Sequence, residues 1–154
     1  MGRCVITISK ATPNDLPEIL RLQKSAFLSE AIALNNHNIE PLTQTLEEME
    51  KVFARGIVLK KTDEKTGEIV GSVRAREEND RVSVMKLMVR PDFQNKGIGT
   101  SLLKEIESLY ENKTFELFTN AKNEKNMRLY LKNGYREVKR TKESDDLEFA
   151  HFEK

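Results

Sequence analysis

Hydrophobic residues recur with two different periods along the chain, and the period predicts the kind of element. In the first third, a short β-branched run at residues 5–8 predicts a strand. Apolar residues then recur at helical spacing over residues 16–27, behind a capping box at residues 12–15. A second capping box at residues 45–48 introduces a second helix, whereas the polar stretch 29–41 predicts an irregular connection.

In the middle of the chain the period changes to that of strands, and helices and strands then alternate. Glycine, asparagine and aspartate separate the strand-like runs, and Gly134 is well placed to end the last helix. The predicted strands are 57–59, 69–73, 82–89, 115–118, 135–138 and 147–152. The predicted helices run from residue 97 to near residue 112 and from residue 123 to residue 131.

The order of these elements predicts the fold class. They follow one another as β-α-α-β-β-β-α-β-α-β-β, with seven strands and four helices. Strands joined by short turns pair antiparallel, whereas a strand–helix–strand crossover brings its two strands together in parallel. We therefore expect an α+β protein with a mixed sheet. A chain of 154 residues suits a single domain over residues 1–154.

Composition narrows the class of partner. The chain carries 26 basic and 25 acidic side chains, a formal net charge of +1, which does not indicate nucleic acid or an anionic membrane surface as a partner. Its single cysteine, Cys4, lies beside the first predicted strand and is interpreted as a packing residue, so no disulfide and no cysteine-rich metal site is expected. The sequence shows neither a signal peptide nor a membrane-spanning apolar run, which predicts a cytoplasmic protein.

The clearest chemical feature is the sequence Gln-Asn-Lys-Gly-Ile-Gly at residues 94–99, which follows a predicted strand and opens a predicted helix. A helix N-terminus offers unpaired N–H groups and a partial positive charge, so it favours anions. Gly97 and Gly99 let the backbone approach an anion closely, and Lys96 adds a positive charge. These features predict a phosphate or pyrophosphate ligand.

Two other glycine-rich phosphate motifs do not fit this turn. The nucleoside-triphosphate loop requires Gly-Lys-Ser/Thr, but Gly99 is followed directly by Thr100. The dinucleotide fingerprint requires a third glycine where Leu102 stands. The pattern Gln-x-x-Gly-x-Gly instead resembles the acyl-CoA signature of the GCN5-related N-acetyltransferase (GNAT) family.

A second motif strengthens this resemblance. Asn123, Asn126, the pair Leu129-Tyr130 and the pair Gly134-Tyr135 resemble the family's other motif in type and spacing, although a small residue is more usual at the place of Asn126. The two motifs are independent, and together they cover residues 82–135. The resemblance implies a GNAT-like fold, in which a mixed sheet of about seven strands is flanked by four helices.

The resemblance also implies acetyl-CoA as the co-substrate and no metal. Backbone groups of the fourth strand would pair with the pantetheine arm, and the turn would bind the pyrophosphate. Asn123 would contact the arm from the far side, where Asn126 either joins it or is simply exposed. The implied cofactor-binding residues are Leu87, Met88, Val89, Gln94, Asn95, Lys96, Gly97, Ile98, Gly99, Thr100, Asn123 and Asn126.

Tyr130 is implied as a catalytic residue near the thioester sulfur. A phenol with a pKa of about 10 cannot pass its proton downhill to a thiol with a pKa of about 8.5, so it would act by donating a hydrogen bond to the developing thiolate. The alternative is a tyrosine that fills core space, which its helical spacing with Met127 and Leu131 also permits.

The general base is harder to identify from the sequence. Several family members carry a glutamate on the fourth strand where this chain has Met85, which cannot accept a proton, and the neighbouring Lys86 is already protonated. Glu30 is the preferred catalytic base, with Glu77, Glu78 and a water chain to bulk solvent as alternatives.

We therefore expect an N-acetyltransferase that moves the acetyl group of acetyl-CoA to a primary amine by direct attack in a ternary complex. A non-catalytic acyl-CoA-binding module is the alternative that Met85 keeps open, and a protein for another phosphate ligand is a third. Residues 25–42 and 142–146, which would face the acceptor, carry both signs of charge. They leave peptide and small-molecule amine acceptors open. Exposed closing strands are compatible with a homodimer.

Overall fold

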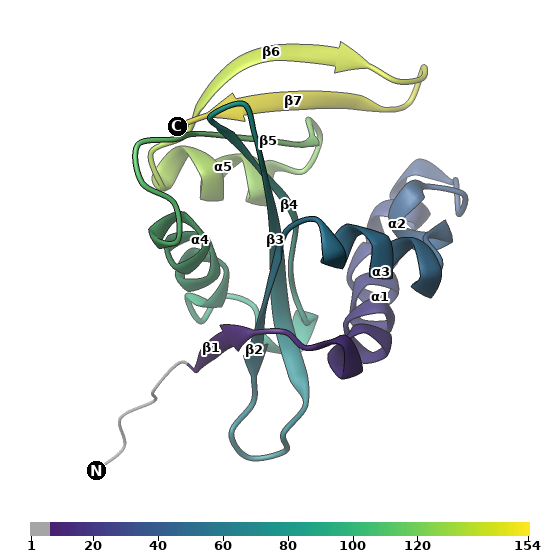
Figure 1. The fold of residues 1–154 in the computed structure, drawn as a ribbon. Helices are drawn as coiled ribbons and strands as arrows, with labels where there is room; N and C mark the ends of the chain where they lie inside the picture. Colours follow the sequence, from purple (N-terminus) through teal and green to yellow (C-terminus); the bar gives the residue numbers. More distant parts are fainter. Residues whose placement is uncertain (1–6) are drawn as a thin grey trace.

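The computed structural model describes residues 7–154 and contains one seven-stranded sheet with helices on both faces (Figure 1). The strands are β1 (Ile8–Lys10), β2 (Ile57–Thr62), β3 (Ile69–Glu78), β4 (Arg81–Val89), β5 (Thr114–Asn120), β6 (Arg136–Lys142) and β7 (Glu148–Glu153). The helices are α1 (Leu16–Leu34), α2 (Glu40–Thr43), α3 (Leu46–Ala54), α4 (Ile98–Ser108) and α5 (Glu124–Lys132). Across the sheet the strand order is β1-β2-β3-β4-β5-β7-β6.

The sheet is mixed, as the order of elements predicts. Five pairs of neighbouring strands are antiparallel, whereas β4 and β5 run parallel. The α4 helix connects these two strands, as a parallel crossover requires. The predicted α+β class, with seven strands and four long helices, is confirmed.

Local signals set several of the element boundaries. At the start of α3, the Glu48 amide donates to the Thr45 hydroxyl at 3.1 Å, and the Thr45 amide donates to the Glu48 carboxylate at 2.9 Å, which completes the predicted capping box. Asn79 and Asp80 join β3 to β4 with φ values of 52° and 64°. Both values lie in the left-handed region that a two-residue hairpin turn requires.

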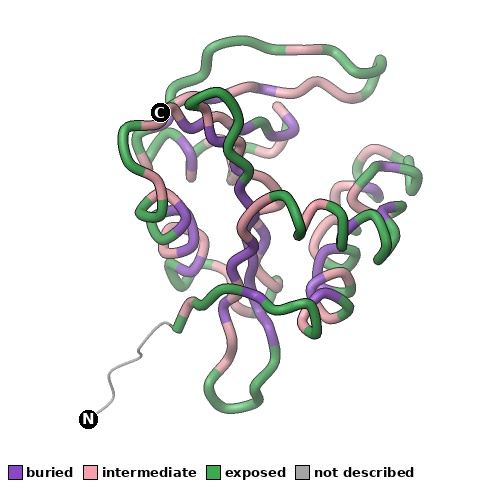
Figure 2. Tube along the Cα trace, in the orientation of Figure 1, coloured by how far each residue is buried: buried purple, intermediate pink, exposed green. Residues whose placement is uncertain are grey.

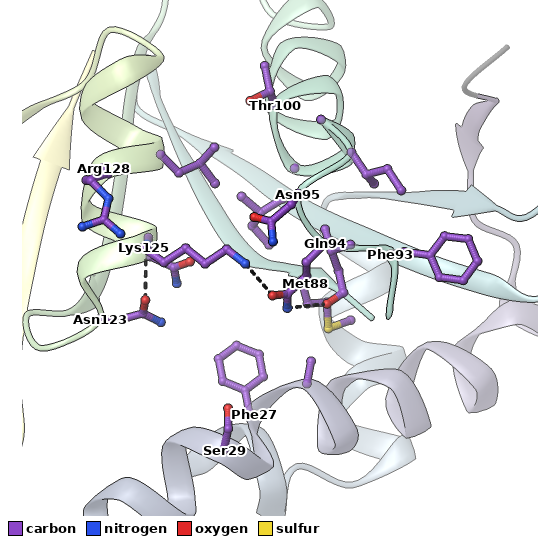
Figure 3. Close-up of a pocket in the computed structure, with 18 of the residues that line it drawn as sticks. Phe27, Ser29, Met88, Phe93, Gln94, Asn95, Thr100, Asn123, Lys125 and Arg128 are labelled. Atoms are coloured by element: carbon purple, nitrogen blue, oxygen red, sulfur yellow. Dashed lines mark hydrogen bonds between the residues drawn. The ribbon is translucent and has the colours of Figure 1, made fainter. Parts of the chain in front are cut away.

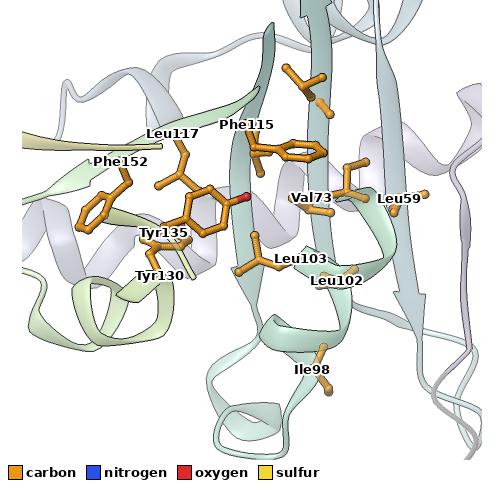
Figure 4. Packing of buried hydrophobic residues seen from close by; sticks show 14 of the residues in the cluster. Leu59, Val73, Ile98, Leu102, Leu103, Phe115, Leu117, Tyr130, Tyr135 and Phe152 are labelled. Carbon is orange, nitrogen blue, oxygen red and sulfur yellow. The ribbon is translucent and has the colours of Figure 1, made fainter. Parts of the chain in front are cut away.

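Apolar residues pack on both faces of the sheet. The larger cluster lies between the sheet and helices α4 and α5, where α4 buries Leu102, Leu103 and Ile106 (Figure 4). A second cluster joins Leu16 and Ile19 of α1 to α3 and to the other face. The strands at the centre of the sheet are therefore buried, whereas β6 is exposed along most of its length (Figure 2). This packing holds β4 firmly from both sides.

The prediction of an irregular connection over residues 29–41 is wrong for much of that stretch. The α1 helix continues to Leu34 and ends at Asn35, whose φ of 49° terminates it in a left-handed conformation. Ala31 is fully buried and keeps the last turns against the protein, although Ser29 and Glu30 before it are polar. The short α2 helix follows and was also not predicted.

Two further boundaries differ from the sequence prediction. The α4 helix ends at Ser108, earlier than the predicted end near Asn112. The first predicted strand is described only in part, because Cys4 and residues 5 and 6 lie outside the described residues, and β1 covers Ile8–Lys10. Within residues 7–154, no helix is both long enough and apolar enough to cross a membrane.

Candidate active site

A cavity of about 790 Å³ opens where β4 and β5 separate (Figure 3). The two strands pair only over residues 81–83 of β4 and 114–116 of β5. Beyond Ser83, β4 continues to Val89 with no described residue paired to its β5-facing edge. Residues of α1, the end of β4, the following turn and α5 line the cavity. A strand edge of this kind offers main-chain hydrogen bonds to an extended ligand.

The turn after β4 presents backbone amides to this cavity. Gly97 has a φ of 82° and is the N-cap of α4, and the first intrahelical bond runs from the Ser101 amide to the Gly97 carbonyl at 3.0 Å. The preceding amides of the first turn therefore have no partner within the helix. A Cβ added at Gly97 would meet no atom within 4 Å, so the glycine borders open space. This is the arrangement of an anion site.

Gln94 connects this turn to both neighbouring elements. Its Nε2 donates to the Val89 carbonyl at 3.1 Å, and its Oε1 accepts from the Lys125 ammonium at 2.6 Å (Figure 3). The side chain therefore ties the end of β4 to α5 across the cavity. Lys96, in contrast, is not among the lining residues, because its ammonium lies over the Phe93 ring, 5.1 Å from the centroid.

The α5 helix forms the opposite wall. The Asn123 side chain accepts a hydrogen bond from the backbone N–H of Asn126 at 3.0 Å and so caps the helix. The side-chain Nδ2 of Asn126 donates to the Thr119 hydroxyl at 3.2 Å. Both asparagines line the cavity. Three basic side chains of this helix line it too, and the sequence analysis missed them, although their helical spacing places them beside the second motif. They are Lys125, Arg128 and Lys132.

A second recess of about 630 Å³ continues the cavity along the outside of the turn. The two cavities share Gly97, Thr100 and Lys132, and the recess adds Lys104 and the C-terminal Lys154. A long ligand could therefore extend from β4 past the start of α4 onto a basic surface. Basic groups of this kind suit a ligand with several phosphates.

Tyr130 does not line the cavity. It is 5% exposed and packs in the core, with its ring centroid 6.0 Å from that of Tyr135 and 5.7 Å from that of Phe152 (Figure 4). Burial raises the pKa of the Tyr130 phenol, so the group stays protonated. Among the described residues its hydroxyl has no hydrogen-bond partner, and it is not fully shielded from solvent, because the Arg74 Nε is the only fully buried side-chain polar atom without a partner there.

Glu30 is the candidate base that the structure brings to the cavity. It lies on the last part of α1, not in a loop, and lines the cavity mouth. Burial raises the pKa of its carboxyl, and the side-chain amide of Asn120 opposes this rise only in part. Glu77 and Glu78 lie at the far end of β3, where they pair with Lys113 at 3.6 Å and Arg76 at 3.2 Å.

The middle of β4 contains a bulge that places no carboxylate at the cavity. Lys86 has a φ of 55°, and the register with β3 shifts beside it. Its ammonium pairs with the Glu40 carboxylate of α2 at 2.6 Å. Met85 faces Arg74 across the β3–β4 pair. The bulge therefore ties α2 to the sheet but supplies no base.

The chain was compared with known families and structures. The model of the acetyltransferase (GNAT) family matches residues 16–135. A search of curated proteins finds no match. Many solved structures match.

Three of these structures are similar over nearly the whole chain. The ribosomal-protein-S18-alanine N-acetyltransferase from Escherichia coli has a TM-score of 0.78 and 19% identity, over 97% of this chain and 92% of that one. The PaiA N-acetyltransferase from Thermoplasma acidophilum, in complex with coenzyme A, has a TM-score of 0.77 and 15% identity, over 96% of this chain and 98% of that one. A phosphinothricin acetyltransferase from Sinorhizobium meliloti, in complex with AcCoA, has a TM-score of 0.76 and 18% identity, over 97% of this chain and 87% of that one. At these identities the structures show a shared fold.

Proposed function

The chain belongs to the acetyltransferase (GNAT) family, and we propose that it transfers the acetyl group of acetyl-CoA to a primary amine by direct attack in a ternary complex. The observation that carries this proposal is the cavity between β4 and β5, with the turn at residues 94–99 on one side and α5 on the other. Two of the similar structures, those from Thermoplasma acidophilum and Sinorhizobium meliloti, contain coenzyme A or AcCoA.

The donor half of the site suits each part of acetyl-CoA. The pantetheine arm carries amide groups, which would pair with the free edge of β4 at Leu87 and Val89 as an added strand does. The pyrophosphate would bind the amides at the start of α4, where Gly97 and Gly99 leave room. The recess with Lys104 and Lys132 would take the phosphorylated end of the molecule.

Proton transfer is proposed for Glu30. Acetyl transfer forms a C–N bond and breaks a C–S bond, and the attacking ammonium must first release a proton. A carboxylate whose pKa is raised by burial is a stronger base than one on the surface, and Glu30 meets this condition at the mouth of the cavity. The proton would leave the amine through Glu30, either directly or through one water.

Tyr130 is proposed as the hydrogen-bond donor to the leaving sulfur. The raised pKa of its phenol makes proton transfer to a thiolate still less favourable, so the hydroxyl would donate a hydrogen bond and keep its proton. Its hydroxyl has no hydrogen-bond partner among the described residues and is available for this bond, although the ring lies in the core and does not line the cavity. The role requires only the hydroxyl to reach the sulfur.

The alternative of a non-catalytic acyl-CoA-binding module is favoured by one observation, the absence of a carboxylate in the middle of β4. Met85 and the ion-paired Lys86 occupy that place. An acceptor panel, read by thiol release from acetyl-CoA, separates the two functions. We expect turnover with at least one class of primary amine. Stoichiometric CoA binding without turnover on peptide N-termini, lysines, polyamines, aminoglycosides or amino acids would favour the module.

A further inference from the structure

An aromatic cluster is exposed in the middle of the sheet. Phe118 of β5 is 52% exposed; it is paired with His151 of β7, whereas the pairing of β5 with β4 ends at Glu116. Its ring centroid lies 4.8 Å from that of Phe149 and 5.6 Å from that of His151, both on β7. We call these three side chains the aromatic platform. Exposed apolar side chains that gather in one patch are candidates for a binding surface.

The platform lies on the same face of the sheet as α1. Side chains alternate along a strand, and the neighbours of Phe118, Leu117 and Thr119, are buried on the opposite face. On the Phe118 side, Glu116 accepts from the Ser83 hydroxyl of β4 at 3.2 Å. Met85 lies two residues after Ser83 on β4 and is paired with Arg74 of β3, whose guanidinium donates to the Gln23 side chain of α1. Figure 1 shows α1 to α3 beside β3 and β4, and the β6–β7 hairpin lies above them in this view.

A chain of neighbouring residues links the platform to the cavity, although no platform ring is among the residues that line it. Phe149 is paired with Asn120 in the β5–β7 register, so the two residues share a face. The side-chain amide of Asn120 lies near enough to the Glu30 carboxyl to lower its pKa, and Glu30 lines the cavity. One residue pair therefore separates the proposed base from the first ring of the platform. An amine held at Glu30 would direct its substituent across Phe149 and Phe118.

Few charged side chains border the platform. Glu116, on the face of Phe118, bonds to the Arg81 guanidinium at 2.8 Å, whereas Lys139, the cross-strand partner of His151, has no ion pair among the described residues. Desolvation and, to a smaller degree, Lys139 lower the pKa of His151, and its ring Nε2 bonds to the Thr141 hydroxyl at 2.8 Å. His151 is therefore neutral at pH 7. The platform thus offers ring faces to a ligand and few free charges.

We infer that the acceptor is a primary amine carrying an aromatic or similarly large apolar group, which stacks on Phe118 and Phe149 while the amine meets Glu30. This inference rests on the proposed acetyl transfer, because Glu30 fixes where the amine lies. The same chemistry is found in a small aryl amine and at a peptide N-terminus with an apolar residue. The exposed ring of Phe118 is the specificity-determining group in both cases.

The test uses two matched pairs of amines and the CoA-saturated protein, so that binding is read without turnover. One pair is 2-phenylethylamine and ethylamine, and the other is L-phenylalaninamide and L-alaninamide. Each pair differs by a phenyl ring only. NMR titration should show the phenyl member of at least one pair binding about tenfold more tightly or better. The first pair reports a small aryl amine, and the second reports a peptide N-terminus.

Variants connect this preference to the platform. Phe118→Ala should abolish it without changing CoA affinity or the affinity for the amine that lacks the ring, and Phe118→Trp should retain it. Val138→Ala is the control, since Val138 is also exposed but lies on β6. A wild-type protein with no preference in either pair, or a preference that survives Phe118→Ala, would overturn the inference. A protein that binds no CoA would instead overturn the proposed function.

Discussion

The two sides of the cavity are built in different ways. The donor side comes from one continuous segment, the end of β4 and the turn at residues 94–99, with α5 opposite. The turn itself contributes the main-chain amides at the start of α4. The proposed acceptor side combines side chains from three distant segments: Glu30 of α1, which lines the cavity, and Asn120 of β5 and Phe149 of β7, which lie outside its lining. Its chemistry therefore depends on tertiary packing.

This difference explains how each side can vary. Main-chain amides are present whatever the side chains are, so a donor site made of them needs only glycine at the turn and a helix start. Side chains on separate elements can change one at a time without disturbing the turn. One fold can therefore keep one donor and accept different amines. The sides also differ in charge, because Lys125, Arg128 and Lys132 line the donor wall while Glu30 lies at the acceptor mouth.

The largest effect is expected from the acceptor side. Glu30→Gln keeps the shape of the residue but removes the base, so kcat/KM should fall by about 10²–10⁴-fold, while CoA affinity should stay unchanged. Because the pKa of Glu30 is raised, wild-type activity should decline as the pH falls through that raised value. The variant should lose this acidic limb. Steady-state rates across pH give both results.

Glu77→Gln is the matched control for this prediction. Glu77 pairs with Lys113 far from the cavity, and its loss should leave kcat/KM and the pH profile unchanged. Equal activity of Glu30→Gln and the wild type would exclude Glu30 as the base and leave the water chain as the route for the proton.

The donor side can be disturbed through its backbone. Gly97 and Gly67 have similar left-handed φ values of 82° and 75°, and a Cβ at either would meet no atom within 4 Å. Alanine at either position should therefore cost about 1–2 kcal/mol of stability. Only Gly97→Ala places a methyl group in the anion site, and we expect about 10–100-fold weaker CoA binding there. Calorimetry and thermal melts measure the two effects, and a loss of affinity in Gly67→Ala would refute this site.

The next prediction concerns the hydroxyl of Tyr130, which is proposed to donate a hydrogen bond to the leaving sulfur. Tyr130→Phe keeps the ring that packs against Tyr135 and Phe152 and removes the hydroxyl only. We expect kcat to fall by about tenfold, at the lower end of general acid–base effects, with little change in stability. Single-turnover rates with acetyl-CoA would show this. An unchanged rate would make Tyr130 a core residue without a catalytic role.

The smallest effect is expected on the basic surface of the donor side. Lys132→Ala should weaken CoA binding by about two- to fivefold and reduce its dependence on salt, because an exposed charge contributes little and is screened. Lys51→Ala, on α3, removes the same charge away from the cavity and should change neither. Identical salt dependence in both variants would show that Lys132 does not contact the phosphates.

The contrast between a donor side built from one local segment and an acceptor side built from distant segments also decides what could be predicted from the sequence. The turn and the Asn123 cap are local, and the structure places Gln94, Gly97 and Asn123 at the cavity as expected. Their role in binding stays a prediction. Lys96 shows the limit of this reasoning, because its charge is drawn to the Phe93 ring.

The acceptor side could not be predicted from local patterns. Glu30 lies on a part of α1 that was predicted as an irregular connection because the stretch is polar. The sequence gives no sign that Phe118 differs from other strand residues, because its exposure depends on the neighbouring elements. Gln23 and Arg74 are polar in the sequence but buried in the structure, because they hydrogen-bond to each other between α1 and β3. Such pairs depend on contacts across the fold, which spacing along the chain does not reveal.

The central claim is that the cavity between β4 and β5 binds acetyl-CoA along the turn at residues 94–99. The most direct test is calorimetric titration of the wild-type protein with CoA, with ATP and NAD as competing phosphate ligands. We expect saturable binding of one CoA per chain, unaffected by either competitor at equal concentration. No binding of CoA, or its displacement by ATP or NAD, would contradict the account.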